Sequence, residues 1–172
     1  MTIPLFREDA YLRETHGVVT RITDEGGIVL DQSIFYPTSG GQPGDSGDLS
    51  WDSGAIEIAT AIKGQGDEIV LVPAEPAALP IVGQKVTQKI TWDRRHRHMR
   101  VHTALHLLSV VIPLPVSGGA ISPEKGRLDF DMPEAPEDKD TLEATLNKLI
   151  ACHFVVSDEW ITDAELDANP DL

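Results

Sequence analysis

Short runs of β-branched and aliphatic residues alternate with polar and turn-forming positions through the first half of the chain. Two such runs lie within residues 15–33, on either side of Asp24-Glu25-Gly26-Gly27, a sequence typical of a hairpin turn. Further strands are predicted at residues 55–62, 68–72 and 85–92. Several short strands separated by turns are typical of a small barrel or sandwich. We therefore predict a β-rich N-terminal domain over residues 1–90.

The pattern changes to a helical one in the second half. Over residues 93–112, Met99, His102, His106 and Leu107 recur at helical spacing, with Asp93 as a candidate N-cap. A strand is predicted at 127–131, a second helix at 140–151, and another strand from 154–156. These elements predict an α+β fold: a β-barrel-like N-terminal part followed by an α+β domain at 91–172 that carries an HxxxH helix.

Composition excludes several classes of protein. The chain has 172 residues, of which 41% are hydrophobic and 24% charged, enough for a packed core. No apolar run approaches the roughly 18 residues of a membrane helix, and the start of the chain lacks the features of a signal peptide. A single cysteine cannot form an internal disulfide. We predict a cytoplasmic protein with no membrane partner.

Charge is unevenly distributed along the chain. The net charge of −14 argues against binding DNA or other polyanions through the whole surface. Residues 85–100, however, hold six basic residues and one acidic residue. This stretch predicts either local docking of a phosphate backbone or simply a solvated helix face.

The segment His102-Thr103-Ala104-Leu105-His106 is the first candidate site. A spacing of four places both imidazoles on one helix face, where they could ligate zinc. The alternative is a pair of histidines with no metal. Thr103 replaces the glutamate of the HExxH motif, so a metalloprotease is excluded. Cys152 is expected in the core rather than on a metal, and His16, His96 and His98 are expected to be exposed polar residues.

The glycine-rich segment at residues 36–47 is the second candidate site. Gly40 and Gly41 permit a close approach of a ligand to the backbone, and Thr38, Ser39 and Gln42 add polar groups at the rim. No Gly-Lys-Ser/Thr follows, so the segment is not a P-loop. A long turn between strands explains the composition equally well.

Together, FYPTSGGQPGDSG and RRHRHMRVHTALHLLSVV resemble the editing domain of alanyl-tRNA synthetase and its free-standing AlaX-type relatives of the medium-length class. The later GRLDFD and LEATLNKLI are similar to family sequence as well. The resemblance implies hydrolysis of the ester that joins a wrong amino acid, serine or in some members glycine, to tRNA(Ala). The partner that it implies is therefore mischarged tRNA(Ala).

The resemblance also implies roles for individual residues. His102 and His106 would ligate zinc, whereas the family's Cys-x-x-x-His pair is absent after Cys152, as if the domain were incomplete at its C-terminus. The expected catalytic and substrate-holding groups are Gln42, Gly40, Gly41, Thr38 and Ser33, either hydroxyl being a candidate to read the serine side chain. The expected tRNA contacts are Arg94, Arg95, Arg97 and Arg100.

Two other functions stay open on sequence grounds. A non-catalytic RNA-binding module that has lost its metal site would explain the missing ligand pair. An unrelated metal-dependent hydrolase of small esters would need only the two histidines. The sequence predicts neither the preferred amino acid nor the oligomeric state.

Overall fold

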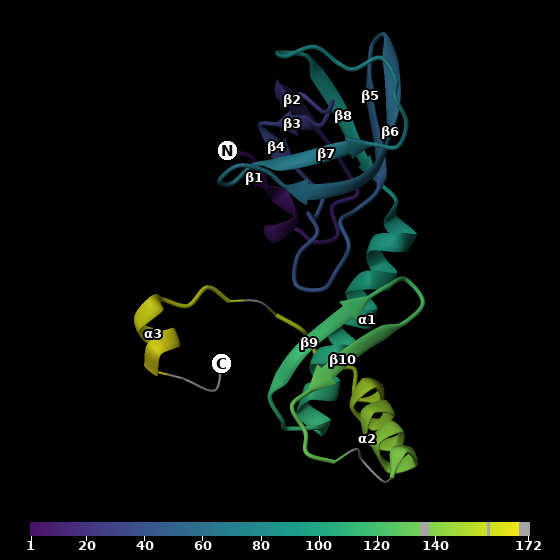
Figure 1. Ribbon diagram of the computed structural model, residues 1–172, viewed down its shortest axis with the longest axis vertical. Helices are drawn as coiled ribbons and strands as arrows, with labels where there is room; N and C mark the ends of the chain where they lie inside the picture. The colour runs from purple at the N-terminus through teal and green to yellow at the C-terminus, as the bar shows by residue number, and fades with distance from the viewer. Residues whose placement is uncertain (135–137, 158, 169–172) are drawn as a thin grey trace. The chain divides into compact units, whose positions relative to one another are not determined.

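The computed structural model of the protein describes residues 1–134, 138–157 and 159–168 (Figure 1). The chain divides into two units, Met1–Pro136 and Glu137–Leu172, so the domain boundary predicted near residue 90 falls inside the first unit. The strands are β1 (Ile3–Pro4), β2 (Glu14–Ile22), β3 (Ile28–Leu30), β4 (Gln32–Ser33), β5 (Gly47–Trp51), β6 (Gly54–Lys63), β7 (Ile69–Pro73), β8 (Lys85–Ile90), β9 (Val116–Ile121) and β10 (Gly126–Phe130). The helices are the 3-10 helix η1 (Leu5–Arg7), α1 (Trp92–Val111), α2 (Lys139–Ala151) and α3 (Asp163–Ala168).

Six strands of the first unit form a closed barrel in the order β2-β3-β7-β6-β5-β8. All neighbours are antiparallel, and β2 closes the barrel by pairing with β8 from Glu14↔Lys89 to Val18↔Lys85. Side chains along a strand point alternately into the barrel and out of it. In β8, Val86, Gln88 and Ile90 are buried, whereas Lys85 and Lys89 are exposed. The predicted α+β fold with a barrel-like N-terminal part is confirmed.

Helix α1 leaves the barrel directly from β8. Thr91 is its N-cap residue, without a side-chain capping bond, so the prediction of Asp93 as the cap is wrong. Asp93 instead lies in the first turn, where its carboxylate interacts favourably with the positive end of the helix dipole. The β9–β10 hairpin packs along α1, and a Cβ added at Gly126 would lie 2.7 Å from Val101 Cγ1. Because of this close contact, the hairpin positions one wall of the site described below.

The second unit contains α2 and α3. Asp138 caps α2 by accepting a hydrogen bond from the Thr141 amide at 2.9 Å. Residues 154–156 form no strand, and Val155 is 93% exposed, so the strand predicted there is wrong. Cys152 is exposed rather than in the core, which corrects the second prediction for this region. Within the described part of the chain, no helix combines the length and apolarity of a membrane span.

Candidate functional site

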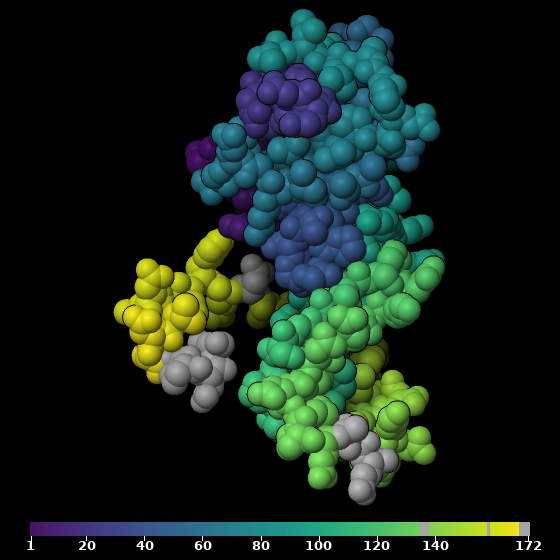
Figure 2. Space-filling model, viewed as in Figure 1, coloured from purple at the N-terminus to yellow at the C-terminus, as the bar shows by residue number. Residues whose placement is uncertain are grey.

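The glycine-rich segment forms a tight turn that projects from the barrel. Ser39 and Gln42 pair through both backbone hydrogen bonds, at 3.1 and 2.9 Å. Gly40 and Gly41 have φ of +55° and +76°, the positive values that both central positions of a type I′ turn require. Gly41 also accepts a hydrogen bond from the Ile121 amide at 3.0 Å, which ties the turn to β9. Figure 2 shows the loop against the β9–β10 hairpin.

A buried ion pair holds this loop on α1. Asp45 accepts hydrogen bonds from the guanidinium of Arg95 and from the Tyr36 amide, the latter at 2.7 Å. The other donors of Arg95 bond the carbonyls of Ala10 and Ile34, and its side chain is only 3% exposed. The expectation that Arg95 contacts tRNA phosphates therefore fails, since every donor nitrogen is engaged inside the protein.

The other arginines of the basic stretch divide into two groups. Arg94 donates to the Gly44 carbonyl at 2.7 Å and is a second anchor of the loop. Arg97 and Arg100 are exposed on α1 and line neither of the cavities described below. Their proposed contact with tRNA stays a prediction.

The two histidines of the HxxxH segment stack on one face of α1. Their ring centroids are 4.9 Å apart and the rings are 14° from parallel. Nδ1 of His102 lies 3.1 Å from Oε1 of Gln42, a buried amide presented by the turn. An amide oxygen can only accept, so this contact favours the tautomer of His102 with the proton on Nδ1 and the lone pair on Nε2. Partial burial and the neighbouring His106 lower the pKa of His102, so the neutral imidazole is favoured.

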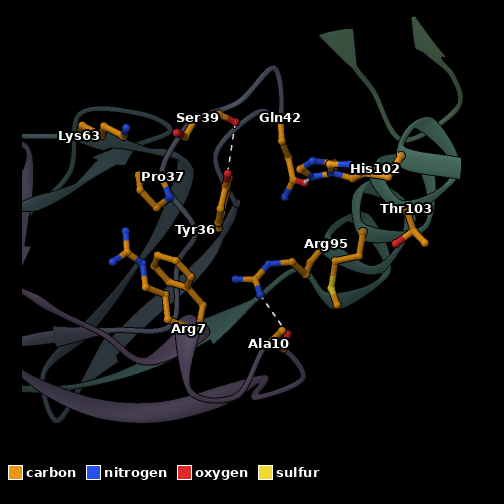
Figure 3. Close-up of a pocket in the computed structure, with 13 residues that line it drawn as sticks. Arg7, Ala10, Tyr36, Pro37, Ser39, Gln42, Lys63, Arg95, His102 and Thr103 are labelled. Carbon is orange, nitrogen blue, oxygen red and sulfur yellow. Dashed lines mark hydrogen bonds between the residues drawn. The ribbon is translucent and has the colours of Figure 1, made fainter. Parts of the chain in front are cut away.

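Two cavities meet at the histidine pair, and Figure 3 shows the residues that line the first. The first has a volume of about 470 Å³, and its lining residues are Phe6, Arg7, Ala10, Tyr36, Pro37, Ser39, Gln42, Lys63, Arg95, Met99, His102, Thr103 and His106. The second has a volume of about 300 Å³. The two turn glycines, both histidines, Ser109 and residues of the glycine-rich strand β9 contribute to its lining. The two sequence motifs therefore come together in space, although about 60 residues separate Gln42 from His102.

The hydroxyls of Thr38 and Ser33 have internal partners. Thr38 Oγ1 accepts from the Gly44 amide at 2.9 Å and bonds the Ala61 carbonyl at 3.3 Å. Ser33 is fully buried, and its Oγ accepts from the Phe35 amide at 3.1 Å. Neither residue lines the cavities. The structure thus brings Gln42, Gly40 and Gly41 to the histidines and leaves these two hydroxyls in the loop scaffold.

Four histidines lie outside the pair, and the sequence predicts the surroundings of three of them. His98 is fully buried, so its predicted exposure is wrong, and no described group hydrogen-bonds either ring nitrogen. His96 is half-buried and stacks on Trp92 with ring centroids 5.3 Å apart, which also corrects the expectation of an exposed residue. His16 is exposed, as expected, and its Nδ1 lies 3.1 Å from Thr87 Oγ1.

Sequence reasoning missed Arg7, Lys63 and Thr103 as residues of the cavity. Arg7 ends η1 and Lys63 ends β6, and neither belongs to a motif. Thr103 lies inside the HxxxH segment, and its position directly after His102 could have indicated that it belongs to the site. The first two carried no such signal, because only the tertiary fold brings the ends of η1 and β6 to the site.

The described residues provide two candidate ligands for a zinc ion. His102 and His106 are suitable nitrogen ligands, and the bond from His102 to Gln42 is the kind of outer contact that orients metal-binding imidazoles. Zinc takes three or four protein ligands, however. Among residues 1–134, 138–157 and 159–168, no group of three or more His, Cys, Asp or Glu is arranged to hold a metal.

Comparison with known proteins identifies similar chains. A family model described as tRNA synthetases class II (A) matches residues 10–94. The chain is 39% identical over 148 residues to the alanyl-tRNA editing protein AlaX-M of Methanosarcina acetivorans, covering 81% of this chain and 60% of that protein. It is 42% identical over 141 residues to the AlaX-M protein of Pyrococcus horikoshii, covering 78% and 62%. An alanine–tRNA ligase of Pyrobaculum arsenaticum is 40% identical over 108 residues, which are 62% of this chain and 12% of the ligase. The chain spans about three fifths of the length of the two AlaX-M proteins.

Proposed function

Because this chain belongs to the family of alanyl-tRNA editing proteins, we propose that it hydrolyses the aminoacyl ester of mischarged tRNA(Ala). The observation that carries the proposal is the meeting of the family's two motifs at one cavity, where Gln42 bonds His102 beside the stacked His106. The proposed substrates are seryl-tRNA(Ala) and glycyl-tRNA(Ala).

An aminoacyl ester is already activated, so the site needs a placed water and a stabilised oxyanion more than a strong nucleophile. In this proposal, Gln42 fixes the neutral tautomer of His102 and leaves its Nε2 lone pair available to hold a zinc ion. The amides of Gly40 and Gly41 make no hydrogen bond to described groups. They are therefore available as donors to the developing oxyanion.

Zinc is proposed as the cofactor, with His102 and His106 as two of its ligands. When bound there, the ion would supply Lewis-acid polarisation of the ester or of a water. The lowered pKa of His102 supports this role, since a metal ligand must be the neutral imidazole.

The test is hydrolysis of seryl-tRNA(Ala) against alanyl-tRNA(Ala), with the zinc content of the same sample measured in parallel. The expected result is loss of serine with alanine spared. His102→Ala and His106→Ala should each reduce both zinc content and rate, and the matched control His16→Ala, on an exposed barrel histidine, should change neither.

Two results would contradict the proposal. Binding of tRNA without hydrolysis, in a zinc-loaded sample, would identify a non-catalytic tRNA-binding module. Hydrolysis of simple amino-acid esters but not of charged tRNA would identify a small-ester hydrolase.

A further inference from the structure

We propose that Arg7, at the end of η1, and Lys63, at the end of β6, bind a backbone phosphate of the tRNA acceptor end inside the first cavity. This inference rests on the proposed function and names the part of the protein that positions the terminal nucleotide. It assigns that task to the barrel side of the cavity rather than to the basic stretch of α1.

The lining of the first cavity is positively charged. The whole chain has 28 acidic and 14 basic residues, yet the 470 Å³ cavity is lined by three cations and two histidines and by no carboxylate. The cavity beside the Asp24-Glu25-Gly26 turn has a similar volume, about 420 Å³, and is lined by Asp24, Glu25 and Glu75 without a cation. The first cavity is therefore a local site of positive potential on an acidic protein, and such a site favours an anionic group.

Two of these three cations have no ion-pair partner among the described residues. Arg95 is neutralised by Asp45, so it adds no free charge to the cavity. Arg7 and Lys63 are exposed, and neither forms an ion pair with any described residue. Their guanidinium and ammonium groups are thus free to donate charge-assisted hydrogen bonds to phosphate oxygens.

Arg7 and Lys63 lie across the cavity from the histidines. Figure 3 shows Arg7 and Lys63 on one side of the cavity, with His102 on the opposite side and Tyr36 and Pro37 between them. In an aminoacylated terminal nucleotide, the ribose separates the 3′ ester from the 5′ phosphate. An ester held at His102 would therefore direct its phosphate toward the barrel side, where the two cations lie.

The arginines of α1 cannot supply this contact equally well. Arg94 and Arg95 are committed to the loop, through Gly44 and Asp45. Arg97 and Arg100 do not line the cavity and would contact a more distant part of the acceptor stem.

The test is binding of a non-hydrolysable analogue, serine joined by an amide to 3′-amino-3′-deoxyadenosine, with and without a 5′ phosphate. Calorimetry with the full chain should show that the phosphate tightens binding by about tenfold, as expected for one charged hydrogen bond. Arg7→Ala and Lys63→Ala should each reduce this preference, and the double variant should abolish it. The matched control is Lys89→Ala, an exposed cation on β8 outside the cavity, which should keep the full preference.

Salt dependence provides a second readout. With a seryl-amide minihelix ending in a single-stranded CCA, each cavity variant should lower the slope of log affinity against log salt by about 0.7. Lys89→Ala should leave the slope unchanged. Equal thermal unfolding midpoints for all variants would show that lost binding is not lost folding.

Three results would overturn the inference: no phosphate preference in the wild type, an unchanged preference in the double variant, or inorganic phosphate alone binding as tightly as the phosphorylated analogue. Hydrolysis of seryl-tRNA(Ala) by the same samples separates this inference from the proposed function. Retained phosphate preference without hydrolysis contradicts the function alone, and hydrolysis with an unaffected double variant contradicts the phosphate contact alone.

Discussion

His98 is a buried histidine without a hydrogen-bond partner among the described groups. Burial lowers its pKa, helped by the nearby charges of Arg94 and Arg95 and opposed by Asp45. In the unfolded chain, the same imidazole titrates near the ordinary value of about 6.5. Below that pH the unfolded state binds the proton more readily, so His98 makes the free energy of unfolding fall as the pH falls.

Replacing His98 with leucine should remove this acid sensitivity. At about pH 7.5 we expect His98→Leu to change stability by less than about 1 kcal/mol, because the neutral ring makes no hydrogen bond that leucine would lose. Between pH 6.5 and about pH 5, the variant should lose less stability than the wild type. Urea unfolding of both proteins at pH 6.5 and at about pH 5 checks this. Parallel pH dependences would refute it, and His16→Gln is the control for an exposed histidine.

Gln42 is the residue through which the loop controls His102. A carboxylate in place of the amide, in Gln42→Glu, should raise the pKa of His102, since a neighbouring negative charge favours the imidazolium. The acid limb of the rate profile should then move to higher pH. NMR titration of the His102 ring measures the change directly. Gln65→Glu, in an exposed turn, should leave the titration where it is, and an unshifted His102 in Gln42→Glu would count against the bond.

At the scale of elements, the turn at 39–42 is held between the barrel, α1 and β9. Gly41 has φ of +76°, and a Cβ there would lie 2.9 Å from the Gly119 carbonyl oxygen. Gly41→Ala should therefore combine backbone strain of about 1–2 kcal/mol with a clash that separates the turn from β9. Gly66→Ala is the matched control, because Gly66 has φ of +57° and open space around it. Equal losses of unfolding free energy in the two variants would contradict the contact.

Much of the element pattern could be predicted from sequence, because a half-buried barrel strand alternates its apolar positions, as β8 does. The strand β9 could not, since its sequence VSGGAI is largely exposed and is fixed by pairing with β10 and with Gly41. Arg95 and His98 were misplaced for a related reason. Both lie in an arginine-rich run that suggests exposure, and only the buried Asp45 explains why a cation lies inside.

The candidate site was only partly predictable for the same physical reason. The histidine pair and Gln42 belong to motifs whose spacing carries chemistry. Arg7 and Lys63 come from the ends of η1 and β6, and no local pattern links them to His102. The tertiary fold brings them together, with β6 in the barrel and η1 outside its six strands.

At the scale of the whole molecule, the hydrophobic core and the site belong to one unit. The buried hydrophobic residues run from Val19 to Ile121, and every residue lining the two site cavities precedes residue 129. A chain ending at residue 136 should therefore fold independently, with an unfolding midpoint within a few degrees of the full chain. Calorimetry of the two chains tests this, and a fragment without a cooperative transition would disprove it.

The closed barrel also has a consequence for synthesis on the ribosome. Its last strand, β8, pairs with its first, β2, and joins residues as far apart as Glu14 and Lys89, which are 75 positions from each other (89 − 14). Such long-range pairing gives a high contact order and slow folding. The early strands must therefore remain unclosed until Ile90 has left the exit tunnel, and α1, with its histidines, follows immediately behind. The emerging chain exposes unpaired strand edges during that interval, which makes it a candidate for chaperone binding before the site exists.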